Sequence, residues 1–527
     1  MNIADASSLI TRLQVYLKSY KKPIPYVENL IQAQIKKIIC AWIFILSPFV
    51  SSAQYDIFWT VEAKTAYAMM QDLRIDESLT IIRLQGITYP ENLIWPYLED
   101  YALFLQIFVR EELALIPSFL ETSTSRIERI TIVPESHPFS LMAQAQMHLH
   151  QCALRMQQTQ FASAANDINK AFKILKRNQK LHADDQSNLR LYAALKIAFG
   201  AIPDQYRWLV SMVTSLSGSI DEGIGELNHI LEESNPVNNV FYMETVLLTS
   251  LAQGRLNNKP AIALELLNKN FGKVPPNRLV QYVMANLYIA NGDNDNAIRI
   301  LLLETGLPGA ERIPFLDFML GKCKLYRGDD DADIYIKNFM LFTKGKHYIK
   351  EAYQKLAWNS LLKGDRDSYF DYMQQILIKG ETQTDEDQQA MREAESMEIP
   401  HPLLLKSRLH FDGGYYDKAF QILNDGMYNT LTHRAQRLEF LYRKGRVLHA
   451  LKSYPEALHY YHLTIKAGEH EPYYYACSAA LHSGIIHETL GSEPAAERYY
   501  TICLQIIPAV YATGLHQKAR TGLSRME

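Results

Sequence analysis

The sequence has little that would build β-structure and no excess of positive charge. Alternating Val, Ile and Thr residues, which mark half-buried strands, are nearly absent. The one short candidate is RITIVPE, at 129–135, and we expect a loop there. The formal net charge is -3, so the chain lacks the basic surplus of a nucleic-acid-binding protein. It also lacks low-complexity tracts and long blocks of like charge. We therefore expect a folded protein with no nucleic-acid partner.

The common motifs of catalysis are also missing. There is no phosphate-binding loop and no nucleophile elbow, and no strand precedes the glycines of Gly223-Ile-Gly225. We therefore predict no enzymatic activity, no cofactor and no small-molecule substrate. One alternative stays open. His148 and Cys152 lie one helical turn apart in MHLHQCAL, so an enzyme or metal-binding protein could have its site in the first half of the chain.

Cysteine is scarce, and its spacing matches no zinc motif. The chain has 5 Cys, of which Cys40 lies near the N-terminus. Cys477 and Cys503 are expected near opposite ends of two antiparallel helices that form one hairpin. Such helices bring those ends together, so a disulfide between the two is geometrically possible, and the sequence leaves it open.

A long hydrophobic segment is absent, but a short one begins after two lysines. KKIICAWIFILSPFVSSAQ, at 36–54, combines a basic flank, a short apolar stretch and small residues, which is typical of a secretory signal peptide. The stretch is too short to span a bilayer comfortably. We predict an N-terminal extension and signal peptide over 1–53, cleavage between Ala53 and Gln54, and export to the periplasm or cell envelope. The alternative is an uncleaved membrane anchor on a cytoplasmic adaptor, in which only this segment contacts the membrane.

What the sequence does have is an internal repeat. The dipeptides Gly292-Asp293, Gly328-Asp329 and Gly364-Asp365 recur 36 residues apart. Gly suits the left-handed residue that ends a helix, and the Asp after it can cap the next helix. The Arg-Gly-Asp tripeptide at 327–329 is therefore predicted to be a turn between helices rather than an adhesion signal.

A second repeat uses small and aromatic residues. Gly445, Ala457 and Tyr461 recur 39 residues later as their counterparts Gly484, Ala496 and Tyr500. A small residue on each helix of a hairpin lets the two helices approach closely, and the aromatic ring fills the seam. A third match runs through Ser407, Ala419 and Leu423.

These positions resemble the tetratricopeptide repeat family. In LYRKGRVLHALKSYPEALHYYHLTI, the residues that stand where that motif places its signature residues are Leu441, Gly445, Leu448, Ala457 and Tyr461. The stretch 200–227 looks like part of exported bacterial members of uncharacterised role. The resemblance implies an all-α fold, a superhelical stack of antiparallel helix pairs (an α-solenoid). It also implies a non-catalytic scaffold for protein–protein interactions, with a protein or peptide partner on the concave face.

The repeats suggest how the chain is divided. We predict an irregular helical region over 54–210, repeats with an acidic insertion over 211–400, well-formed repeats over 401–508 and a capping helix over 509–527. Within the insertion, Thr384 precedes three acidic residues and is expected to cap a helix.

The candidate binding residues come from the first helices of the repeats, which line the inner surface in this family. Tyr442, Arg446 and His449 follow one another at spacings of four and three, so they share one helix face. The corresponding stripe on an earlier helix is Tyr282, Asn286 and Ile289. Aromatic and Arg side chains often anchor interfaces, which makes both stripes candidates for a partner-binding groove. The three residues of Tyr473-Tyr474-Tyr475 are expected to face different ways.

Overall fold

The computed structural model describes residues 55–202 and 218–526. These residues form 25 α-helices and no β-strand, which confirms the predicted fold class. The predicted signal segment and its cleavage between Ala53 and Gln54 lie outside the described residues. The chain divides into two compact units, 1–56 and 57–527, and all of the described helices belong to the second. None of these helices is both long and apolar enough to cross a membrane.

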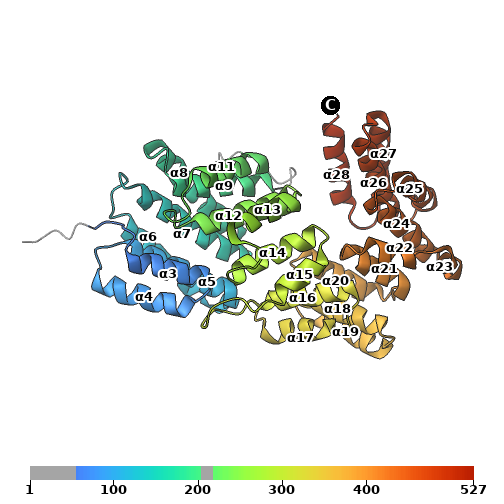
Figure 1. The fold of residues 1–527 in the computed structure, drawn as a ribbon, viewed down its shortest axis with the longest axis horizontal. Coiled ribbons are helices and arrows are strands. Elements are labelled where there is room, and N and C mark those ends of the chain that lie inside the picture. Colours follow the sequence, from blue (N-terminus) through green and yellow to red (C-terminus); the bar gives the residue numbers. More distant parts are fainter. Residues whose placement is uncertain (1–54, 203–217, 527) are drawn as a thin grey trace, which may run out of the picture. The chain divides into compact units, whose positions relative to one another are not determined.

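The first half of the second unit contains α-helices of 10 to 21 residues that follow one another along the chain (Figure 1). The segment RITIVPE holds the end of α6 and a turn, as predicted. The elements are α3 (Val61–Gln71), α4 (Ile75–Thr88), α5 (Ile94–Arg110), the 3-10 helix η1 (Leu113–Leu115), α6 (Ile116–Ile130), α7 (Pro138–Gln157), α8 (Phe161–Leu181), α9 (Gln186–Gly200), α11 (Ile220–Glu233), α12 (Tyr242–Leu251), the π-helix η2 (Ala252–Leu256) and α13 (Pro260–Phe271).

The second half continues with the same kind of helix pair. Its elements are α14 (Arg278–Ala290), α15 (Asn294–Leu301), α16 (Pro314–Arg327), α17 (Ala332–Phe342), α18 (Ile349–Leu362), α19 (Arg366–Ile378), α20 (Asp385–Ser396), α21 (Pro402–Asp412), α22 (Tyr416–Ile422), α23 (Asp425–Thr430), α24 (Arg434–Ala450), α25 (Tyr454–Gly468), α26 (Tyr475–Thr489), α27 (Glu493–Gln505) and α28 (Ala512–Ser524). Neighbours along the chain pack as pairs, as in α16 with α17, α24 with α25 and α26 with α27.

The Arg-Gly-Asp tripeptide is a turn between α16 and α17, as predicted. Gly328 ends α16 with a φ of +88°, in the left-handed region that favours glycine. Arg327 donates from Nε to Asp329 Oδ1 at 2.8 Å and from Nη1 to Asp295 Oδ1 at 3.2 Å. The charged side chains of the tripeptide are therefore engaged within the fold.

Two sister turns have the same form. Gly292 and Gly364 have φ values of +70° and +81°. Asp293 and Asp365, which follow them, each accept the backbone N–H of the third residue further on, at 3.2 Å and 3.0 Å. The 36-residue repeat is therefore a repeat of left-handed helix ends, as the sequence predicts. The Asp caps the next helix in two of the three turns, whereas Asp329 accepts from Arg327 and does not cap α17.

The seam of each C-terminal hairpin is built from the residues that the second repeat singles out. Tyr461 and Tyr500 are fully buried. A Cβ added to Gly445 would lie 2.7 Å from the ring of Tyr461, and one added to Gly484 would lie 2.6 Å from the ring of Tyr500. Each glycine therefore makes the room that the aromatic ring of the second helix occupies.

The acidic insertion forms a helix that packs against α18 and α19. Thr384 caps α20 by accepting the N–H of Asp387 at 3.0 Å, as predicted. The buried carboxylate of Asp387 in turn accepts the backbone N–H of Tyr348 at 2.7 Å and of Glu351 at 3.0 Å. One acidic residue of this segment is thus an internal cap for the start of α18.

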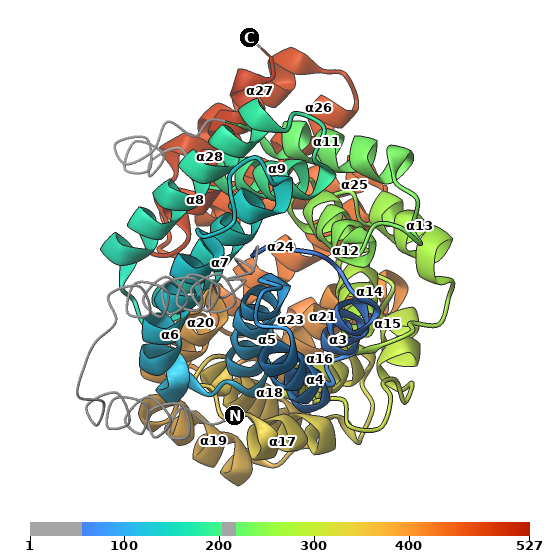
Figure 2. The same cartoon turned by 90° about the vertical axis from the view of Figure 1, so that its left-hand side faces the viewer.

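The N-terminal helices lie against loops from the middle of the chain (Figure 2). The carbonyl of Leu73, between α3 and α4, accepts the N–H of Glu311 at 2.9 Å. The carboxylate of Glu311 is paired with Arg110 at the end of α5. Asn277 Nδ2 donates to Asp72 Oδ1 at 3.1 Å. These contacts tie α3–α5 to the segments that flank α14–α16.

Glu111 makes a further contact of this kind. It follows α5 with a φ of +55°, a backbone conformation that non-glycine residues rarely adopt. Its carboxylate accepts the Thr343 hydroxyl at 2.6 Å and the backbone N–H groups of Lys344 at 3.0 Å and Gly345 at 2.7 Å. We call these contacts the Glu111 latch.

Candidate functional site

A cavity of about 1920 Å³ lies among the C-terminal helices. Its walls come from α20, α21, α24, α26 and α28 and from the segments between them. Of the three hairpins involved, the cavity residues belong to the first helices α21, α24 and α26, and no described residue of the second helices α22, α25 or α27 lines it. The cavity therefore lies on the layer of first helices, where the predicted groove was placed.

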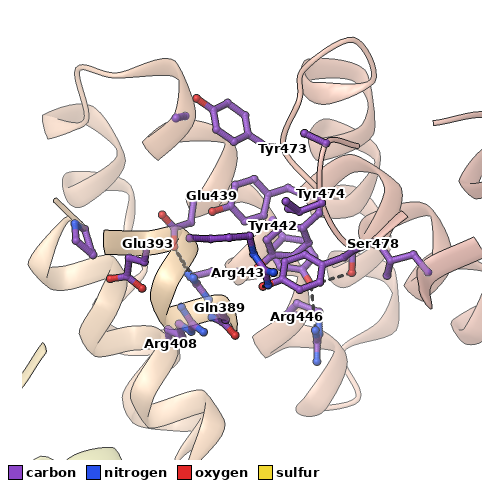
Figure 3. Close-up of a pocket in the computed structure, with 18 of the residues that line it drawn as sticks. Gln389, Glu393, Arg408, Glu439, Tyr442, Arg443, Arg446, Tyr473, Tyr474 and Ser478 are labelled. Atoms are coloured by element: carbon purple, nitrogen blue, oxygen red, sulfur yellow. Dashed lines mark hydrogen bonds and ion pairs between the residues drawn. The ribbon is translucent and has the colours of Figure 1, made fainter. Parts of the chain in front are cut away.

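Three arginines, labelled in Figure 3, line both the cavity and a small pocket beside it, and we call this part the inner end of the cavity. Arg408 comes from α21, and Arg443 and Arg446 come from successive turns of α24. Arg443 donates from Nε to Glu439 Oε1 at 2.6 Å. Arg408 Nε lies 3.7 Å from Asp412 Oδ2. Spacing along α24 brings Arg443 and Arg446 together, but only the packing of α21 on α24 brings Arg408 to them.

Arg446 has a different environment from the other two. It donates from Nη1 to Tyr442 Oη at 3.0 Å, and its guanidinium carbon lies 4.9 Å from the ring centre of Phe411. No carboxylate of a described residue forms an ion pair with it. Arg446 is therefore a half-buried cation held by aromatic rings and one phenol.

Aromatic rings form the wall beside these arginines. Tyr442 is buried, and its hydroxyl lies 2.9 Å from Ser478 Oγ. Its ring centre is 5.7 Å from that of Tyr474 and 5.3 Å from that of Tyr475. Tyr473, Tyr474 and Tyr475 all contribute to the cavity wall, at the start of α26. Tyr474 and Tyr475 also pack against the core of the C-terminal helices.

His449, the third residue of the predicted stripe, does not line the cavity. Its Nδ1 is 3.3 Å from Tyr461 Oη, and its ring lies against His482, which does line the cavity. Burial, with the nearby positive charge of Arg446, lowers the pKa of His449 to about 4 and that of His482 well below its usual value. Both imidazoles are therefore neutral at pH 7.

The earlier stripe lies on α14, and none of its three residues lines the cavity. Tyr282 and Ile289 are half-buried against the core that surrounds α14. Asn286 is half-buried as well, and its Oδ1 has no hydrogen-bond partner among the described residues. The role of both stripes in binding a partner stays a prediction, but the structure brings only Tyr442 and Arg446 to the cavity.

The first half of the chain has a polar cluster where the second half has the cavity. Its members come one each from the first helices of five successive pairs, and we call it the Glu244 cluster. The five residues are Tyr67 (α3), Tyr101 (α5), Gln146 (α7), Arg190 (α9) and Glu244 (α12). The hydroxyls of Tyr67 and Tyr101 donate to Glu244 Oε1. The guanidinium of Arg190 donates to Glu244 Oε2 at 2.8 Å and to Gln146 Oε1 at 3.2 Å.

Burial, with the charge of Glu244, raises the pKa of Tyr67 and of Tyr101 well above the usual value, so both phenols remain protonated donors. Aromatic rings surround the cluster, and the ring of Phe241 lies 4.4 Å from the guanidinium carbon of Arg190. The inner layer of the first half is thus filled by the protein's own side chains. No sequence pattern indicates this cluster, because the partners are 143 and 177 residues apart.

The residues of the metal-site alternative do not meet a third ligand. His148 Nδ1 lies 3.3 Å from Gln151 Oε1, and Cys152 is buried. Within residues 55–202 and 218–526, no three His, Cys, Asp or Glu side chains gather as a metal site would require. A buried polar contact that the sequence did not indicate lies nearby, where His150 Nδ1 is 2.9 Å from Asp100 Oδ1.

Cys477 and Cys503 lie together as predicted, in the hairpin of α26 and α27. Their sulfur atoms are 3.5 Å apart, and both are free thiols. The two thiols are therefore in contact, and a bridge between them stays a prediction.

Comparison with known proteins gives no closer assignment. No family model matches the chain, and no curated protein matches it. Two solved structures are similar over most of their length. Yeast Tom70 is 10% identical, with 88% of this chain and 95% of that chain covered and a TM-score of 0.27. The Cut9 and Hcn1 hetero-tetramer of the APC/C is 11% identical, with 93% and 94% covered and a TM-score of 0.24. These scores are too low to assign the fold by similarity. The fold is therefore assigned from the packing of the helices in pairs.

Proposed function

We propose that the protein is a non-catalytic scaffold that holds a segment of a partner protein in the cavity of its C-terminal half. One observation carries this proposal. The layer of first helices is filled by the Glu244 cluster in the first half, whereas in the second half the same layer surrounds an open cavity. An open inner surface on a stack of helix pairs is where a partner can bind.

The size and the lining of the cavity favour a segment of protein as the occupant. Its volume of about 1920 Å³ exceeds the roughly 300–1,000 Å³ of common small-molecule pockets. Its wall offers Tyr and Arg side chains, which are the types that most often anchor protein interfaces.

A photo-crosslinking experiment tests this function. A benzophenone amino acid would replace Tyr473, which lines the cavity, or Phe370, an exposed ring on α19 that does not. We expect irradiated cells to give a discrete cross-linked protein at position 473 and none at position 370. Equal cross-linking at both positions, or none at 473, would contradict the proposal.

We also propose that the chain acts in the cell envelope after export. The support is the order of a basic flank, an apolar stretch and small residues over 36–54. Mass spectrometry of the protein from its native cells should find a chain that begins at Gln54. A peptide that contains Ile38 in the mature protein would show that this segment is kept.

A further inference from the structure

Arg446 is a cation for which the described residues of the cavity supply no counter-ion. Its only hydrogen-bond partner among them is the hydroxyl of Tyr442, and its guanidinium lies near the rings of Phe411 and Tyr442. A partly buried charge is costly unless an opposite charge or a set of hydrogen bonds accompanies it. A guanidinium group has five N–H donors, and most of those on Arg446 have no partner within the described part of the chain.

The neighbours of Arg446 add to the positive charge. Arg408 and Arg443 approach from α21 and from the preceding turn of α24. Each has a carboxylate partner, because Arg443 pairs with Glu439 and Arg408 Nε lies 3.7 Å from Asp412 Oδ2. Three guanidinium groups thus share two carboxylates, and Arg446 is the one without a carboxylate partner among the described residues.

Acidic residues of α20 also line the cavity, and none of them forms an ion pair with Arg446. Glu393 accepts the indole N–H of Trp358 at 2.7 Å with Oε1 and the amide N–H of Gln354 at 2.6 Å with Oε2. Its negative charge acts on Arg408 rather than on Arg446. Arg446 is left with N–H donors that no described residue accepts.

Resting on the proposed function, we infer that the partner segment is acidic and that one of its Asp or Glu carboxylates binds Arg446, with Arg408 and Arg443 beside it. A carboxylate accepts two parallel N–H groups from one guanidinium, and such charge-assisted pairs are strong and directional. The ring of Tyr442 lies beside Arg446, with Tyr474 and Tyr475 packed against it, and these rings suit the apolar parts of the same segment.

Selection from a library of random short peptides tests this inference. The library would be displayed on phage and selected on the full chain at low salt, where charge pairs are least screened. We expect the selected peptides to carry Asp or Glu at one fixed position, enriched about tenfold over the starting library. Synthetic peptides with Gln in place of that residue should bind about tenfold more weakly.

Matched variants show whether Arg446 is responsible. Arg446→Gln should lose the acidic preference, and Arg446→Lys should keep part of it because the charge remains. Arg437→Gln should keep it fully. Arg437 is an exposed residue of the same helix that does not line the cavity, and its Nε donates to the Leu431 carbonyl at 2.8 Å.

The outcomes separate this inference from the proposed function. Selected peptides that bind without an acidic preference, or an unchanged preference in Arg446→Gln, would overturn the inference and leave the proposed groove intact. If the full chain retained no peptide above background, both would fail. A thermal melt of each variant shows whether it is folded, and Arg446→Lys keeps the test valid if Arg446→Gln does not fold.

Discussion

Gly445 shows how much a single methyl group matters at a helix seam. Its backbone faces the buried ring of Tyr461, and an added Cβ would lie 2.7 Å from that ring. Gly445→Ala should therefore lower the free energy of unfolding by about 1–3 kcal/mol, since a packed ring cannot move without further displacement. Chemical denaturation monitored by circular dichroism measures this change.

The control for Gly445 is a glycine with empty space beside it. Gly225 lies on α11, and a Cβ added there would meet nothing within 4 Å. Gly225→Ala should raise the free energy of unfolding by about 0.5–1 kcal/mol, because alanine favours the helix. Destabilisation by both substitutions to the same extent would mean that contact with the Tyr461 ring is not what makes glycine necessary at position 445.

The two histidines near Arg446 predict how stability depends on pH. The folded-state pKa values of His449 and His482 lie below the unfolded value, so the unfolded chain binds more protons. The free energy of unfolding should therefore be highest near pH 7 and fall as the pH is lowered from about 6.5 toward 4. Denaturation across this range measures it, and His482→Asn should give a shallower fall. An equal slope in the variant would show that other groups cause the dependence.

Arg446 can be tested by the same titration. Its positive charge is one cause of the lowered pKa of His449, after burial. Arg446→Gln should therefore raise the pKa of His449, because a neighbouring like charge is removed. NMR of the imidazole signals would measure the shift. No rise would mean that burial alone holds His449 neutral.

Helix α20 is the element in which a single acidic side chain matters most. Asp387→Ala would leave the backbone N–H groups of Tyr348 and Glu351 without an acceptor. We expect a loss of about 1–3 kcal/mol, the usual cost of leaving buried donors unpaired. Asp385→Ala, which changes an exposed residue in the same first turn of the helix, should be nearly neutral. If the two variants melt alike, α20 is not a support for α18.

The elements themselves could be predicted where the repeat is strong. Gly328 ends a helix in the left-handed region, and Gly445 makes room for a ring at a helix seam. The spacing of such glycines along the chain was therefore sufficient to predict these helices and turns. The site was only half predicted, because Tyr442 and Arg446 share a helix face, whereas Arg408 reaches them through the packing of α21 on α24. Contacts between helices of different pairs leave no periodic signal in a sequence.

For the whole molecule, the Glu111 latch and Arg110 connect the first helix pairs with segments more than 200 residues further on. Such contacts make distant pairs open together, whereas a simple stack of repeats has only neighbouring contacts. Helices α3–α5 and the loop at 343–345 should therefore open in one step, with the same free energy of opening. A variant that breaks the latch should expose both regions at once.

Glu111→Ala removes the acceptor of the Thr343 hydroxyl and of the N–H groups of Lys344 and Gly345. Hydrogen exchange should become faster in 343–346 and, because the two regions open together, also in α4 and α5. The expected loss is about 1–3 kcal/mol of local stability. Glu121→Ala, an exposed change on α6, should alter neither region. Faster exchange confined to 343–346 would mean that the first helix pairs hold without the latch, and that the stack behaves as a series of neighbours.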